Sequence, residues 1–215
     1  MDGTEAHDPP TRVAPTAEPP VVLGDRPPHP PGRAGGALAA SVGRSATLLW
    51  RGEIRQPRDR VGDVLHFADG SSGRVYRETQ HRGPVVEDPA TLIVRFRLRF
   101  VRGQGHPLFR AESLLNTPLF AGFPGFASKL WLAHDVNHTY RGVYEWDGPD
   151  RAESYVRSLW WALALVSERP SIGYVVIPGV RRDEVLRDPD VLAELAPGAG
   201  GEWWRVVRCP ATRRP

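Results

Sequence analysis

The clearest hydrophobic pattern in the chain is the segment TLIVRFRLRF at residues 91–100, where apolar and basic side chains alternate. Successive side chains of a β-strand point to opposite faces of a sheet, so this period of two predicts a strand. One face of this strand carries only apolar residues, namely Leu92, Val94, Phe96, Leu98 and Phe100. The other face carries Ile93 and three arginines, Arg95, Arg97 and Arg99.

Further elements follow this strand in a regular order. They are a short helix at Pro107–Leu115, strands at Phe126–His134 and Thr139–Trp146, a long helix from Pro149 and a strand at Ile172–Ile177. The long helix is predicted from an apolar stripe at helical spacing, with proline in its first turn and Asp147 or Gly148 as N-cap. The order β-α-β-β-α-β predicts an α+β, ferredoxin-like fold, in which a four-stranded antiparallel sheet has both helices on one face.

The segments on either side of this unit are read from their composition. Nine prolines and five glycines fall within residues 1–40, which predicts a disordered tail with too few apolar residues to form a core. Residues 41–88 are predicted as a β extension, with Thr47–Trp50 as a strand and a hairpin turning at 68–73. Residues 89–180 are the ferredoxin-like domain. Residues 181–215 are predicted to hold a helix at Asp183–Leu195, a last short strand at Glu202–Arg208 and a tail.

One face of the predicted sheet has no helix to cover it. We expect Arg97 and its neighbouring arginines to lie there, with Lys129 and Trp131 in phase on the second strand. Two such faces packed together in a homodimer would enclose a polar-lined ligand cavity. The alternative is an open sheet that faces water, with arginine side chains lying over it.

Composition narrows the possible classes of protein. The net charge is +3, and no block of five or more basic residues occurs, so nucleic-acid binding is not expected. No run of 18 apolar residues suggests a membrane span, and no signal-peptide pattern is found, so a cytoplasmic location is expected. The single cysteine, Cys209, excludes an intramolecular disulfide and a cysteine-based zinc site. Of the 28 basic residues, 27 are arginines and only Lys129 is a lysine.

Three sequence blocks carry a family resemblance. FPGFASKLW at 123–131 fits P-G-F-x-x-K-x-W, GVYEW at 142–146 fits G-[IV]-Y-x-[FW], and AESY at 152–155 fits A-x-x-Y. Ala111-Glu112-Ser113 precedes the first block. Over about residues 91–179 the chain resembles the YdhR-type mono-oxygenase family of the dimeric α/β-barrel superfamily. About six additional residues, around Thr117–Gly122, depart from the family pattern.

The resemblance implies cofactor-independent oxygenation of an electron-rich aromatic substrate, such as a polycyclic phenol. A site for this chemistry must hold a flat ring, exclude water and stabilise an oxyanion. The candidate ring walls are Trp131, Tyr144, Trp146, Trp160 and Tyr174, although Trp146 is also a candidate packing anchor. Arg97 and Lys129 are the candidate oxyanion partners, and His134 or His138 the candidate base.

Other interpretations stay open at this point. Lys129 is a candidate for a structural ion pair with Glu145 as much as for a catalytic role. His134 and His138 are predicted to flank a strand turn, either as solvated residues or as part of a metal or haem site. No P-loop or complete dinucleotide motif occurs, so no nucleotide or other organic cofactor is expected. The alternatives to an oxygenase are another tailoring reaction and a non-catalytic, dimeric small-molecule-binding or accessory protein.

Overall fold

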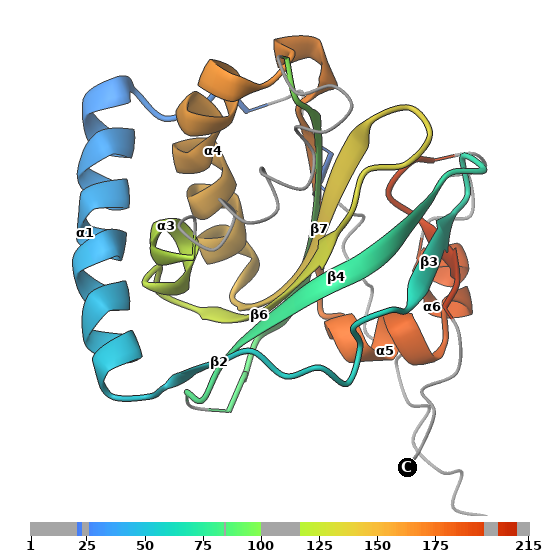
Figure 1. The fold of residues 1–215 in the computed structure, drawn as a ribbon, viewed down its shortest axis with the longest axis horizontal. Coiled ribbons are helices and arrows are strands. Elements are labelled where there is room, and N and C mark those ends of the chain that lie inside the picture. The colour runs from blue at the N-terminus through green and yellow to red at the C-terminus, as the bar shows by residue number, and fades with distance from the viewer. Residues whose placement is uncertain (1–20, 23–25, 84, 100–116, 196–201, 210–215) are drawn as a thin grey trace, which may run out of the picture.

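The computed structural model describes residues 21–22, 26–83, 85–99, 117–195 and 202–209 (Figure 1). These residues form a mixed α+β structure in which a curled antiparallel sheet has helices on both sides. The helices are α1 (Pro31–Trp50), α3 (Pro118–Ala121), α4 (Pro149–Val166), α5 (Arg182–Arg187) and α6 (Asp190–Leu195), with a 3-10 turn at Arg169–Ser171. The strands are β1 (Val21–Val22), β2 (Ile54–Arg55), β3 (Val64–Phe67), β4 (Ser72–His81), β5 (Pro89–Arg97), β6 (Phe126–Leu132), β7 (Thr139–Asp147), β8 (Gly173–Pro178) and β9 (Val206–Arg208).

The strands of the described residues join in the order β1-β8-β5-β7-β6-β4-β3-β9, and β2 pairs separately with β4. Every pairing is antiparallel. The strands predicted at Thr91–Phe100, Phe126–His134, Thr139–Trp146 and Ile172–Ile177 are confirmed as β5, β6, β7 and β8 with small shifts of their ends. They are neighbours in the sheet, but a sheet limited to these four strands is wrong, because it continues through β4, β3 and β9.

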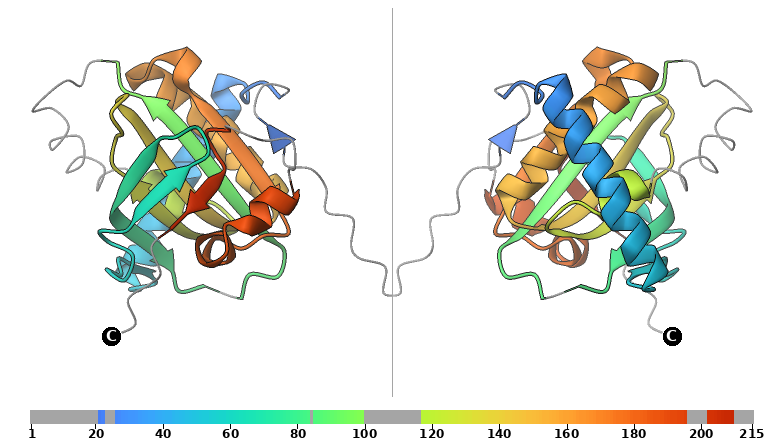
Figure 2. Two further views of the ribbon diagram at one scale, coloured as in Figure 1. Left: turned by 90° about the vertical axis from the view of Figure 1, so that its right-hand side faces the viewer. Right: turned by 90° about the vertical axis from the view of Figure 1, so that its left-hand side faces the viewer.

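The sheet has a hydrophobic core on each of its faces. The core on the side of α1, α3 and α4, called here the helix face, contains Leu92, Tyr144 and Trp146 with Tyr155 and Leu159 of α4. The core on the other side, called the C-terminal face, contains Ile93, Leu130 and Val143 with Leu186 of α5 and Trp204. Figure 2 shows α1 and α4 over one side of the sheet and α5 and α6 on the other.

Two helices of the helix face illustrate how the sequence forms it. The N-cap of α4 is Gly148, whose φ of 99° suits glycine, and Pro149 occupies the first turn, as predicted. Helix α1 buries small residues, and Ser41 and Ser45 both donate hydrogen bonds to the carbonyl oxygen of Pro118 in α3, at 3.1 and 3.0 Å. This close packing positions α3, which in turn contributes to the candidate site described below.

Three predictions on the flanking segments are wrong. Residues 31–40 are not part of a tail, and Thr47–Trp50 is not a strand, because both lie in α1. The helix expected at Asp183–Leu195 is divided into α5 and α6, between which Pro189 removes a backbone donor. The helix predicted at Pro107–Leu115 and most of the tail predicted at residues 1–40 lie outside the described residues.

The prediction that one face of the sheet is uncovered is also wrong. The C-terminal face is filled by α5, α6 and Trp204 of the same chain, and the guanidinium of Arg95 lies 4.3 Å from the centre of the Trp203 ring. Trp131 belongs to the opposite, helix-face core. The homodimer was expected because the face that carries Arg95 and Arg97 was predicted to be uncovered, and this face is covered by the chain itself. The homodimer therefore stays a prediction. Among the described residues, no helix combines the length and the apolar character that crossing a bilayer requires.

Candidate functional site

Lys129, the chain's single lysine, is buried in the middle of β6 with 6 % of its surface exposed. The strand register places it between Thr79 of β4 and Tyr144 of β7. Tyr144 in turn pairs with Leu92 of β5, a residue of the helix-face core. Lys129 therefore points into the interior between the sheet and its helices, where a charged side chain is uncommon.

Three aromatic rings surround the amino group of Lys129. Its Nζ atom lies 3.1 Å from the centre of the Trp131 ring, 4.5 Å from Phe120 and 4.7 Å from Tyr144. The face of an aromatic ring carries partial negative charge and attracts a cation. Phe120 comes from α3, so the docking of α1 and α3 completes this aromatic cage, defined here as Phe120, Trp131 and Tyr144.

A second buried cation, Arg77 of β4, lies against the same tryptophan. Its guanidinium carbon is 4.0 Å from the centre of the Trp131 ring, and its Nη2 donates a hydrogen bond of 3.3 Å to Thr117 Oγ1. Trp131 Nε1 donates a hydrogen bond of 3.2 Å to Thr79 Oγ1, which fixes the plane of the indole. The ring of Trp131 therefore lies in contact with two basic side chains at once.

Lys129 has no acidic counterpart within the described ranges, where no carboxylate oxygen comes within 4.0 Å of its Nζ atom. Burial, and then the positive charge of Arg77, lower the pKa of Lys129 well below its ordinary value. The aromatic faces act in the opposite sense, because they favour the ammonium form. A lysine with a lowered pKa can accept a proton as a neutral amine and then donate hydrogen bonds as an ammonium.

Gly125 and Gly142, which belong to the motifs that carry the family resemblance, stand where a side chain would collide with its neighbours. A Cβ atom at Gly142 would lie 2.7 Å from the ring of Tyr144, so this glycine gives the tyrosine room to lie over the sheet. Gly125 has a φ of 84°, and its added Cβ would lie 2.5 Å from the carbonyl oxygen of Asp147. The motifs thus shape the backbone around Lys129 as well as supplying its neighbours.

Of the predicted site residues, the structure brings Lys129, Trp131 and Tyr144 into direct contact. Trp146 shares their face but is fully buried, with its ring stacked on Tyr155 at a centroid distance of 4.9 Å. This environment supports the interpretation of Trp146 as a packing anchor. The hydroxyl of Tyr144 lies 3.4 Å from that of Tyr155, and burial raises the pKa of both phenols.

Trp160 and Tyr174 lie in a different place. Together with Arg26 and Arg157 they line a cavity of about 270 Å³ between α4 and β8. The strands β5 and β7 separate β8 from β6, so these two rings do not form walls for a ligand at Lys129. The five aromatic residues predicted as one set therefore fall into two locations.

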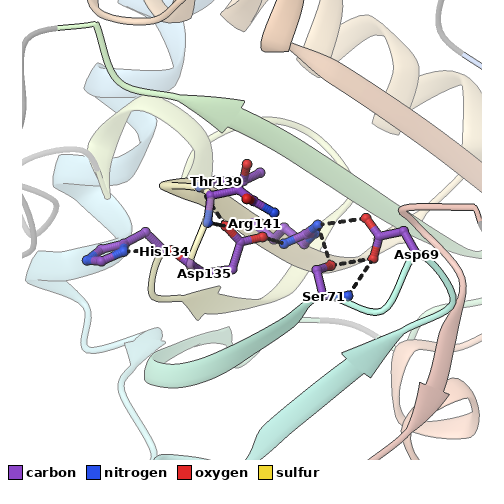
Figure 3. A network of polar contacts seen from close by, with 7 residues as sticks. Asp69, Ser71, His134, Asp135, Thr139 and Arg141 are labelled. Atoms are coloured by element: carbon purple, nitrogen blue, oxygen red, sulfur yellow. Dashed lines mark hydrogen bonds and ion pairs between the residues drawn. The ribbon is translucent and has the colours of Figure 1, made fainter.

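His134 and His138 meet at the turn between β6 and β7, with their ring centroids 5.6 Å apart. A network around Asp135 orders this turn (Figure 3). Asp135 Oδ1 accepts the backbone N–H groups of Asn137 and Thr139 at 2.8 and 3.0 Å, and Oδ2 accepts a hydrogen bond of 2.8 Å from Arg141. Nδ1 of His134 donates to the carbonyl oxygen of Asp135 at 3.0 Å.

The same network reaches a second hairpin. Arg141 Nη2 donates to Ser71 Oγ at 2.7 Å and contacts Asp69 Oδ2 at 3.3 Å, which ties the β6–β7 turn to the β3–β4 turn. His134 is five residues beyond Lys129, a separation of roughly 16 Å in an extended chain. The histidines therefore lie at the turn beyond the end of β6, whereas Lys129 lies inside that strand beside Phe120, Trp131 and Tyr144.

Two further charged residues that were expected beside Lys129, Arg97 and Glu145, have other partners in the structure. Arg97 does not join Lys129, because its half-exposed side chain pairs with Glu168 at 3.2 Å near the end of β5. The predicted ion pair between Lys129 and Glu145 is wrong. Glu145 pairs with Arg181 of the segment entering α5, at 3.2 Å, and burial raises the pKa of its carboxyl group.

Sequence reasoning missed Arg77, Thr79 and Phe120. Arg77 is one of 27 arginines, and Thr79 gives no chemical signal, so the sequence does not set either apart. Phe120 falls in the segment that departs from the family pattern, which could have drawn attention to it. Across the described residues, no group of three or more histidine, cysteine or acidic side chains is arranged to hold a metal ion. A comparison of the chain with protein-family models and with curated proteins found no match.

Proposed function

We propose that this chain is an enzyme that binds a hydroxylated polycyclic aromatic molecule beside Lys129 and oxygenates it without a cofactor. The observation that carries the proposal is a buried lysine amine enclosed by Phe120, Trp131 and Tyr144, with no carboxylate within ion-pair distance in the described part of the chain. The aromatic side chains suit a flat ring, and the amine suits its acidic hydroxyl.

The chemistry follows from the two protonation states of Lys129. The neutral amine takes the proton of the substrate hydroxyl, and the ammonium formed stabilises the resulting oxyanion, with the nearby charge of Arg77 assisting. The electron-rich anion reduces O₂ directly. In a substrate with a ring methylene tautomer, one oxygen atom becomes a ring carbonyl, and the other leaves as water with the two methylene hydrogens. The substrate supplies all four electrons.

The arrangement of the central strands supports a family relationship as part of this proposal. We infer that β5, β6, β7 and β8, with α4 between the last two, correspond to a ferredoxin-like unit, because their order in the sheet is β8-β5-β7-β6. This unit coincides with the part of the chain, residues 91–179, that resembles the YdhR-type mono-oxygenases. The chemistry rests on that resemblance and on Lys129, since one fold supports many activities.

An oxygen electrode tests the proposal with anthrone-type polycyclic phenols as substrates. Lys129→Met should lower O₂ consumption by about 100-fold or more, the range for losing a general base. Arg58→Met, which removes an exposed arginine, is the matched control and should keep full activity. Circular dichroism melts show that each variant is folded.

Two outcomes would contradict the oxygenase proposal. Full activity in folded Lys129→Met would show that the lysine takes no part in the reaction. Tight binding of the phenols without any O₂ consumption would favour the alternative, a non-catalytic small-molecule-binding or accessory protein.

A further inference from the structure

A second cavity, separate from Lys129, lies between the C-terminal half of α1, the α3–β6 loop and the residues that follow β4. Its volume is about 480 Å³. Pockets that bind small molecules commonly measure about 300–1,000 Å³. Phe126 lines this cavity and Phe120 contacts Lys129, and the centroids of the two rings lie 5.0 Å apart, but neither Phe120 nor Lys129 is among the lining residues. The two locations can therefore be tested independently.

The inner wall of this cavity is apolar and well anchored. Ala121, Phe123 and Phe126 are buried residues of the helix-face core, and Leu48 of α1 completes the wall. His81 is held beside them, since its Nδ1 atom lies 3.3 Å from the carbonyl oxygen of Phe126 and its Nε2 atom 3.5 Å from Glu53. A flat or branched hydrocarbon body fits such a wall.

The rim of the cavity is basic. Arg44, Arg51 and Arg151 line it, and Asp147 is the acidic residue among the described lining residues. Asp147 is already engaged, because its Oδ1 accepts the backbone N–H groups of Glu87 and Asp88 at 3.0 Å each and its Oδ2 pairs with Arg151 at 2.7 Å. These donors lower the pKa of Asp147.

The other two arginines of the rim are less engaged. Arg51 contacts Glu53 only at 3.9 Å. Arg44 is exposed, and in the described ranges no ion pair of Arg44 is found. A guanidinium group suits carboxylate, sulfonate and phosphate groups because it can present two parallel donors to them.

We propose that this cavity binds an organic anion whose apolar body lies on Phe123 and Phe126 and whose acidic head group is held by Arg44 and Arg51. A carboxylate, a sulfonate and a phosphate ester share the chemistry that this rim recognises. The site is distinct from the oxygenation proposed at Lys129 and does not depend on it.

The test compares two fluorescent naphthalene dyes, the anionic 8-anilinonaphthalene-1-sulfonate and the uncharged N-phenyl-1-naphthylamine. The double variant Arg44→Met/Arg51→Met should weaken binding of the sulfonate by about tenfold or more, as expected for lost charge-assisted hydrogen bonds. Binding of the uncharged dye should change less than about twofold. Arg33→Met, an exposed arginine of the same helix that does not line the cavity, should leave both affinities unchanged.

Filling the cavity provides the second part of the test. Thr47→Trp places a large ring in the cavity from α1 and should abolish binding of both dyes, whereas Ala46→Trp, next to it but outside the lining, should not. Ala127→Leu fills the cavity from β6 and replaces Thr47→Trp in this test if that variant is poorly folded.

Three results would overturn the inference. They are unchanged sulfonate affinity in Arg44→Met/Arg51→Met, unchanged binding of both dyes in folded cavity-filling variants, and loss of sulfonate binding in Lys129→Met. The last result would place the dye at Lys129 and leave the proposed oxygenase function standing.

Discussion

The amine nitrogen of Lys129 lies 3.1 Å from the centre of the ring of Trp131, two residues further along the same strand. Residues i and i+2 of a strand share a face, so this contact is built into the local backbone. The hydrogen bond from Trp131 to Thr79 holds the ring in place. The pair is therefore a fixed feature of β6, and the ring face that Lys129 contacts is one that favours a cation.

Because burial lowers the pKa of Lys129, its protonation should couple to folding. Below the pKa that Lys129 has in the folded chain, this side chain is protonated in both the folded and the unfolded state. The free energy of unfolding is then lowered by the full cost of burying its charge. Between that pKa and about 10.5 the unfolded chain binds more protons, so stability should rise with pH, by at most about 1.4 kcal/mol per unit. Urea unfolding from pH 7 to 9.5 should show this slope in the wild type and not in Lys129→Met. If the free energy of unfolding depended on pH in the same way in the wild type and in Lys129→Met, the buried position of Lys129 would be contradicted.

The pKa of Lys129 can be measured directly, because lysine labelled with ¹³C at Cε gives one signal in a chain with a single lysine. Arg77→Met should raise this pKa, since it removes a neighbouring positive charge. Trp131→Leu should lower it, since it removes the ring that favours the ammonium. NMR titration of the three proteins checks the order, and an equal pKa in all of them would show that neither neighbour acts on the amine.

The ion pair between Arg141 and Asp135 should be important for stability. Both side chains are about 3 % exposed and their charged atoms lie 2.8 Å apart. Arg141→Met leaves a buried carboxylate without its cation and should cost about 3 kcal/mol. Arg97→Met, which breaks the half-exposed pair with Glu168, should cost less than about 1 kcal/mol. Urea denaturation measures both values, and similar losses would show that burial of the pair does not matter.

Two glycines, one in α1 and one directly after α3, should respond in opposite ways to replacement by alanine. A Cβ atom at Gly122 would collide with the backbone oxygen of Ser41, so Gly122→Ala should push α1 and α3 apart and lower stability by more than about 2 kcal/mol. Gly36 in α1 has open space around it, so Gly36→Ala should raise stability by about 0.5–1 kcal/mol. Thermal melts distinguish the two, and a neutral Gly122→Ala would argue against the docking of α1.

The C-terminal face should depend on Arg182 of α5. Its side chain is 2 % exposed and pairs at 2.8 Å with Glu78, which is 1 % exposed. Arg182→Met should cost about 3 kcal/mol because Glu78 is left buried and charged, and adding Glu78→Gln should recover part of the loss. Arg187→Met, an exposed arginine of the same helix, is the control and should change stability by less than about 0.5 kcal/mol. A stable Arg182→Met would mean that α5 is held by its apolar residues alone.

The sequence by itself determined the elements whose periodicity is strong. The alternation in residues 91–100 located β5, and the stripe after Pro149, with Gly148 before it, located α4. Lys129 was recognisable as the chain's single lysine, and its contact with Trp131 follows from their spacing in one strand. These features are local, so the order of residues is sufficient to predict them.

Only the tertiary structure decided which face each strand presents and what covers it. Lys129 shares a face with Leu92 because β6, β7 and β5 pair in the register Lys129–Tyr144–Leu92. A shift of one residue would exchange the faces, and no single strand contains that information. Likewise α1 is rich in Gly, Ala and Ser, and its helix is stabilised by packing on α3 and α4, while the C-terminal segment covers the second face through long-range contacts. The register and these distant contacts placed Lys129 between the sheet and its helices.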